Sequence, residues 1–150
     1  MRVAGMVGIC LLLAGCATQR GDAIISNDDQ QTRDVMSQAI ELVATRYIDP
    51  VGREQIVVNA LDGLSAIDPN IRIGMTPDEI ILGYNGKTVR NLALPDADSE
   101  EQDTLLWTEL TLKGVGIYRV YSPDLRHADA LSVQSALVSG SIKNLDRYSR

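Results

Sequence analysis

The chain contains no phenylalanine, and only one tryptophan and one histidine among its 150 residues. Without phenylalanine, its hydrophobic core must consist mainly of aliphatic side chains. The single histidine, His127, cannot supply the ligand set of a zinc site by itself. It stands among polar residues, which indicates an ordinary surface position, because a catalytic histidine needs a nucleophile and an orienting partner beside it.

Positive charge is also scarce, with 14 basic residues against 20 acidic ones and a formal net charge of −6. Such a chain lacks the basic footprint by which proteins neutralise nucleic-acid phosphates, so we expect no nucleic-acid partner. The same charge disfavours broad contact with anionic lipid headgroups. Lysine occurs only at Lys87, Lys113 and Lys143, which limits where a lysine base for catalysis can lie.

No apolar run reaches the roughly 20 residues that a membrane-spanning helix needs. Residues 3–14 come nearest, and they follow Arg2 as the h-region of a secretory signal peptide follows its positive n-region. A buried core helix is the alternative, but a core helix rarely begins at the third residue and lacks a polar face. The run ends in LAGC at residues 13–16, which resembles the lipobox of bacterial lipoproteins.

In lipoproteins the signal is removed before the cysteine, which then carries the lipid. The resemblance therefore implies that residues 1–15 are a signal peptide, that Cys16 is lipidated, and that residues 16–28 are anchor and tether. Ala17 in place of aspartate implies sorting to the outer membrane, with the protein on its periplasmic face. The membrane, reached through this lipid, is thus the first expected partner.

Cleavage before Cys16 would remove Arg2 and Cys10 from the mature chain. The remaining 13 basic and 20 acidic residues would give a net charge of −7. With Cys16 modified, no cysteine would be left for a disulfide or a thiolate metal site. We therefore expect neither a metal nor another cofactor.

Residues 29–150 have the length of one domain. The spacing of apolar residues predicts a first helix, capped by Asp28 or Asp29, that runs to about Ile48, and a second over residues 53–66. Asp-Pro follows each helix, and the residue before proline avoids the helical region. The short connection between the two helices predicts an antiparallel pair.

The pattern changes to a period of two over residues 71–94. Asn85-Gly86 lies between two apolar runs, which is the signature of a type I′ hairpin turn. A turn at Thr76-Pro77-Asp78 would add one more strand, giving a three-stranded meander. The hairpin edge is a candidate site for an extended peptide, but a structural flap is the favoured interpretation, because most hairpins are scaffolding.

Residues 95–103 carry five carboxylates. Their spacing does not match a calcium loop. Ser99 and Gln102 fit a capping box, so the acids indicate the start of a helix whose dipole they stabilise. We expect this helix to reach Tyr121, although residues 111–121 also suit a strand.

A last helix is expected from Asp129 to about Asn144, after a break at Ser122-Pro123. Taken together, the patterns predict an α+β fold that is mostly helical. It has about four helices and a small antiparallel β-meander or hairpin inserted at about residues 71–94.

Two segments carry a longer pattern: YIDPVGREQIVVNALDGLSAIDP at residues 47–69 and GSIKNLDRYS at residues 140–149. They resemble the N-terminal region of the C-terminal processing peptidases, also called tail-specific proteases, and the second resembles the family's entry into its PDZ domain. The matching residues are Tyr47, Asp49, Pro50, Gly63, Asp68, Pro69, Gly140, Leu145, Asp146, Tyr148 and Ser149. In this family such residues are structural.

That family cleaves polypeptides with a Ser-Lys dyad in a domain beyond the PDZ domain. The resemblance implies that this chain is the N-terminal helical region of such a peptidase, truncated where the PDZ domain should begin. A dyad needs a lysine whose pKa is lowered by burial beside an exposed serine, and none of the three lysines has such a sequence context. We therefore expect no catalytic residue and no enzymatic activity in this chain.

The expected function is that of a lipoprotein domain that anchors and organises a periplasmic processing peptidase, by dimerisation or by docking a substrate or partner. The alternative is a free-standing periplasmic binding or adaptor lipoprotein. A homodimer through the first helices is one candidate, because the apolar arc of the first helix is wider than one partner helix needs. Packing of the last helix on the first would cover the same arc within one chain.

Overall fold

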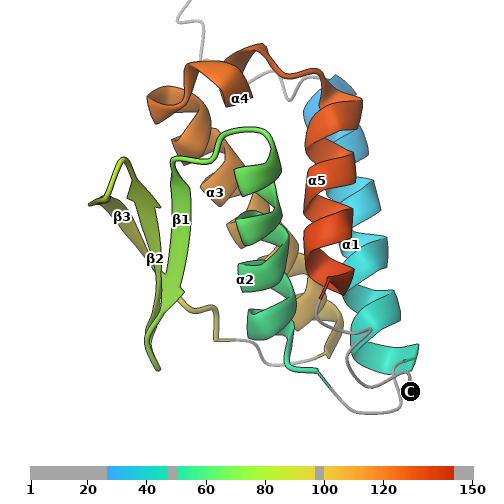
Figure 1. The fold of residues 1–150 in the computed structure, drawn as a ribbon. Helices are drawn as coiled ribbons and strands as arrows, with labels where there is room; N and C mark the ends of the chain where they lie inside the picture. The colour runs from blue at the N-terminus through green and yellow to red at the C-terminus, as the bar shows by residue number, and fades with distance from the viewer. Residues whose placement is uncertain (1–26, 47–50, 97–99, 144–150) are drawn as a thin grey trace, which may run out of the picture.

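The structure is a computed structural model that describes residues 27–46, 51–96 and 100–143 (Figure 1). It confirms an α+β fold that is mostly helical, with a three-stranded antiparallel sheet in the order β1-β2-β3. The elements are α1 (Asn27–Arg46), α2 (Arg53–Gly63), the 3-10 turn η1 (Leu64–Ala66), β1 (Ile71–Met75), β2 (Glu79–Tyr84), β3 (Lys87–Ala93), α3 (Glu100–Tyr121), α4 (Pro123–His127) and α5 (Ala130–Ile142).

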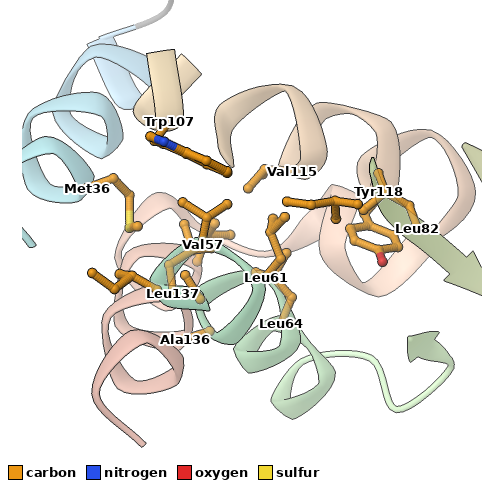
Figure 2. Packing of buried hydrophobic residues seen from close by; sticks show 14 of the residues in the cluster. Met36, Val57, Leu61, Leu64, Leu82, Trp107, Val115, Tyr118, Ala136 and Leu137 are labelled. Carbon is orange, nitrogen blue, oxygen red and sulfur yellow. The ribbon is translucent and has the colours of Figure 1, made fainter. Parts of the chain in front are cut away.

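Helix α2 lies at the centre of the molecule, between the sheet and α5 (Figure 1), and it also contacts α1 and α3. Figure 2 shows Val57 and Leu61 of α2 in the middle of the hydrophobic core, with Trp107 beside them and Tyr118 towards the sheet. Both aromatic side chains are buried, and the other buried apolar side chains are aliphatic or Met36. The expected aliphatic core is thus confirmed for the described residues.

The first two helices contact each other and run in opposite directions, as expected (Figure 1). Their contact is small, however, because α2 packs most extensively against α5, and α1 packs mainly against α3 and α5. Met36, Ile40 and Val43 of α1 are consequently buried within one chain. The large contact between α2 and α5 depends on two glycines, described below, whose pairing local sequence patterns do not reveal.

The hairpin has the expected turn, because Asn85 and Gly86 both have positive φ, 52° and 76°. Strands β2 and β3 are in register from Glu79 opposite Ala93 to Leu82 opposite Arg90. Gly83 then lies opposite Thr88, which leaves Val89 as the extra residue of a β-bulge. One face of the sheet packs on the helices through the buried side chains of Ile71, Ile80, Leu82 and Leu92.

Helix α3 is continuous to Tyr121, so the alternative of a strand over residues 111–121 is wrong. Two of its three threonines, a residue type that favours strands, donate their hydroxyl protons to carbonyls one turn earlier. Thr108 Oγ1 lies 2.8 Å from Thr104 O, and Thr111 Oγ1 lies 2.8 Å from Trp107 O. These bonds let buried threonines remain in a helix without leaving their hydroxyls unpaired.

The short helix α4 is absent from the sequence-based expectation, which places only a break at Ser122-Pro123. Ser122 caps this helix by accepting a hydrogen bond of 3.0 Å from the Leu125 amide, and Pro123 occupies its first turn. The expected cap of α5 is confirmed, since Asp129 Oδ1 accepts a 2.8 Å bond from the Ser132 amide. Helix α5 ends at Ile142, two residues before the expected end.

Candidate functional site

Asp68 is a buried acid at the junction of three segments. It lies between η1 and β1, and its residue surface is only 1% exposed. Oδ2 accepts hydrogen bonds from the Ser122 hydroxyl at 2.6 Å and from the Tyr84 hydroxyl at 3.0 Å. Oδ1 accepts two bonds of 2.9 Å from the backbone amide and the side-chain amide of Asn70. The carboxylate therefore has a donor for each of its acceptor sites.

The electrostatics favour the ionised form of this group. Burial works to raise the pKa of Asp68, but the bonds donated by Ser122, Asn70 and Tyr84 outweigh burial and hold its pKa below the usual range. Burial together with the neighbouring Asp68 raises the pKa of Tyr84, so the phenol stays protonated as a donor. We name this cluster of Asp68, Asn70, Tyr84 and Ser122 the Asp68 junction.

The arrangement of the Asp68 junction is unsuited to nucleophilic catalysis. A catalytic serine gives its proton to a base that can hold it, whereas a carboxylate with a lowered pKa is a weak base. Ser122 is fully buried, and its oxygen already accepts a bond from Leu125. The junction instead ties the end of β2 and the start of α4 to the entry of β1.

Gly63 of α2 and Gly140 of α5 lie against each other where the two helices cross. A Cβ on Gly63 would lie 2.2 Å from Ala136 O, and a Cβ on Gly140 would lie 2.4 Å from Asn59 O. Each added Cβ would also lie 2.9 Å from the Cα of the other glycine. Backbone atoms block both positions, so the close approach of α2 and α5 depends on glycine at each of them.

A cavity of about 300 Å³ lies between α1 and α3. Ion pairs between Arg33 and Glu109 and between Arg119 and Asp29 join the two helices beside it, the second at 3.4 Å. Arg119 Nε is buried, and it has no hydrogen-bond partner in the part of the chain that the structure describes. The cavity holds charges of both signs, and its two acids, Asp29 and Glu109, are each paired with an arginine.

The three lysines and the histidine are all exposed. Lys87 begins β3, Lys113 lies in α3, and Lys143 follows α5. His127 lies at the end of α4, with Nδ1 2.7 Å from Pro123 O. Within residues 27–46, 51–96 and 100–143, no three His, Cys, Asp or Glu side chains are placed to hold a metal ion, and no helix is long and apolar enough to cross a membrane.

The structure places four of the residues that match the peptidase family. It brings Gly63 and Gly140 into contact, puts Asp68 in the Asp68 junction, and leaves Pro69 exposed with its carbonyl 2.6 Å from Arg72 Nη1. The other candidate residues lie outside the described ranges, and these are Cys16, Tyr47, Asp49, Pro50, Leu145, Asp146, Tyr148 and Ser149.

Three members of the Asp68 junction, Asn70, Tyr84 and Ser122, were not predicted from the sequence. Ser122 has a usable signal, because Ser-Pro-Asp combines a capping residue, a proline for the first turn and an acid for the helix dipole. Tyr84 has no such signal, since its bond to Asp68 joins residues 16 apart in sequence.

Comparisons of the chain with family models, with curated proteins and with solved structures found no match.

Proposed function

We propose that this chain is a non-catalytic lipoprotein domain on the periplasmic face of the outer membrane, where it anchors and organises a C-terminal processing serine peptidase. The lipobox-like residues that end at Cys16 are the reason for proposing a lipid anchor. The two segments that resemble tail-specific proteases motivate the peptidase. The domain itself supplies a lipid attachment and a stable scaffold.

The contact between Gly63 and Gly140 is the observation that carries this proposal. These glycines come from the two segments that resemble the family, and they meet at one helix crossing. Each glycine taken singly is an ordinary helix-ending residue. Their contact supports the view that the two segments form one structural unit. In that unit α5 is held against α2, so a domain joined after α5 would be attached to a rigidly packed helix.

The chemistry of the described residues supports a scaffold role. Asp68 already has four donors, the Ser122 hydroxyl is bonded on both sides, and the three lysines are exposed. A Ser-Lys dyad needs a desolvated lysine beside a serine that substrate can reach. We therefore assign the peptide-bond chemistry to a separate domain of the proposed peptidase.

Sequencing the gene beyond codon 150 tests the proposal directly. A continuous reading frame that encodes a PDZ domain and a domain with a Ser-Lys dyad supports it. A stop codon followed by unrelated sequence contradicts it. If the peptidase is encoded, Cys16→Ala should move peptidase activity from the membrane fraction to the soluble periplasmic fraction, while Cys10→Ala, which alters only the signal segment, should not.

A further inference from the structure

Among the residues that the structure describes, no strand lies beside the outer edge of β3. There β3 pairs with β2 alone, and Figure 1 shows it as the outermost strand of the sheet. The Leu94 amide donates a hydrogen bond to Asp78 O at 3.1 Å, which identifies the residues of β3 whose backbone groups bond to β2. Because bonding alternates along an antiparallel strand, the backbone groups of Asn91 and Ala93 point away from β2. β3 therefore offers two outward-facing N–H and C=O pairs.

The side chains along this edge are basic. β3 contains Lys87 and Arg90 and no acid, whereas the whole chain has a net charge of −6. Lys87 lies opposite Tyr84 and Arg90 opposite Leu82, and the bulge at Val89 accounts for their odd spacing. Since residues 82 and 84 share one face of β2, Lys87 and Arg90 also share a face.

The nearest acid of β2 lies on the other face. Glu79 shares its face with Ile81, and its Oε2 accepts a 2.9 Å bond from the Asn91 side chain. It is therefore poorly placed to neutralise Lys87 and Arg90. Both cations are exposed, and no ion pair joins either of them to another described residue.

These charges select among the strands that can join the edge. A second copy of β3 added in parallel and in register would bring lysine against lysine and arginine against arginine, and like charges across a strand pair are destabilising. An acidic strand would meet opposite charges instead. Because Val89 is the extra residue of the bulge, Lys87 and Arg90 are spaced as residues i and i+2 of a regular strand. Their side chains can therefore pair with carboxylates at alternate residues of a partner strand.

We propose that the β3 edge binds an extended acidic peptide segment as a fourth strand of the sheet. The backbone of Asn91 and Ala93 bonds the peptide backbone, and Lys87 and Arg90 pair with carboxylates two residues apart. Hydrogen bonds between the two backbones set the register of the peptide, and the two cations select acidic peptides. This docking edge is independent of the peptidase assignment and of the lipid on Cys16.

The test uses the full chain in detergent, labelled with ¹⁵N, and two synthetic probes. These are Ac-Val-Glu-Val-Glu-Val-Glu-NH2 and its lysine counterpart, Ac-Val-Lys-Val-Lys-Val-Lys-NH2. The acidic probe should shift the amide signals of Asn91 and Ala93 and slow their hydrogen exchange, and added salt should weaken it. The basic probe should bind at least tenfold more weakly. Equal binding of both probes, or no change at Asn91 and Ala93, would overturn the proposal.

Two variants separate strand addition from simple charge attraction. Asn91→Pro removes an outward N–H and leaves the bonds to β2 in place, since proline is tolerated on an edge strand when its N–H faces solvent. It should lower affinity for the acidic probe at least fivefold. Asn91→Ala loses the bond to Glu79 but keeps the N–H, so it should bind nearly as the parent chain does. Equal affinity in both variants would show that no backbone bond forms.

A charge reversal completes the test. The double variant Lys87→Glu with Arg90→Glu should prefer the basic probe, and an unchanged amide spectrum away from β3 would show that the fold is retained. Preference for the acidic probe in that variant would overturn the role of the two cations. Amide shifts at Asn91 and Ala93 that grow with protein concentration, without any probe, would show that a second copy occupies the edge and would overturn the acidic partner.

Discussion

Gly63 and Gly140 approach so closely that a Cβ on either one would lie 2.9 Å from the Cα of the other. Side chains can rotate away from an intruding methyl group, but the atoms nearest to these positions belong to the backbone of the facing helix. Relief would therefore require α2 and α5 to move apart. That movement would loosen contacts of Leu137 and Leu61 in the centre of the core.

Gly140→Ala should destabilise the domain by roughly 1–3 kcal/mol, because the added methyl group forces two packed helices apart. Gly116→Ala is the matched control, since no atom lies within 4 Å of its added Cβ in another helix. In an exposed helical position alanine should stabilise by about 0.5–1 kcal/mol. Urea unfolding followed by circular dichroism measures both, and equal effects of the two changes would contradict the close crossing.

Asp68→Asn should lower the free energy of unfolding by about 1.5–3 kcal/mol at neutral pH, because bonds to a charged acceptor are lost. Folding lowers the pKa of Asp68, so its contribution is fully present above the unfolded value of 3.8 and is lost as the pH falls through the folded value. The difference between parent and variant should therefore shrink below pH 4. Asp96→Asn, at an exposed site, is the control and should cost little at any pH.

Cys16 should carry lipid. Mass spectrometry of protein extracted from membranes should show a mature N-terminus at Cys16 with added acyl mass. Cys16→Ala should leave an uncleaved precursor or release the protein from the outer membrane. An unmodified N-terminus at Met1 in the membrane-extracted protein would contradict the lipoprotein assignment.

The purified domain, residues 17–150, should not cleave unfolded proteins or peptides with apolar C-termini, because its described serines and lysines form no activated pair. Turnover measured with a fluorogenic peptide should match a buffer blank. Turnover that co-purifies with the domain and is lost in Lys143→Ala would reveal a catalytic site that includes Lys143 and would contradict this prediction.

The homodimer through the first helices stays a prediction, and the structure narrows the side chains that can mediate it. Met36, Ile40 and Val43 are buried in one chain, whereas Leu42 is 61% exposed. If α1 pairs between subunits, Leu42→Asp should dissociate the dimer and Val43→Asp should unfold the domain instead. Sedimentation of the lipid-free domain at rising concentration decides this, and a constant monomer mass would rule the dimer out.

Local chemistry made much of the fold predictable. The turn at Asn85-Gly86 requires only that two adjacent residues adopt positive φ. The helix cap at Asp129 requires only the backbone amide three positions later. Relationships across long sequence distances were not predictable from such patterns. Asp68 meets Ser122 across 54 residues, and nothing near either one specifies the other.

The main partner of α2 was not predictable for a related reason. A short connection favours pairing with α1, whereas the depth of contact is set by glycines that face each other from distant segments. Periodicity identifies which face of the second helix is apolar, since Ile56 and Ala60 of α2 and Leu64 of the following turn η1 are all buried. It does not identify which of three helices lies on that face.

The scarcity of aromatic residues has a practical consequence for measurement. Trp107 is the only tryptophan, it is 5% exposed, and it lies near Met36 and Val57 in the helical core (Figure 2). Its emission therefore reports on one location, with no second indole to blur the signal. The sheet has Tyr84 but no tryptophan. A shift in indole emission thus follows the opening of the helical layer around Trp107 and does not report directly on the sheet.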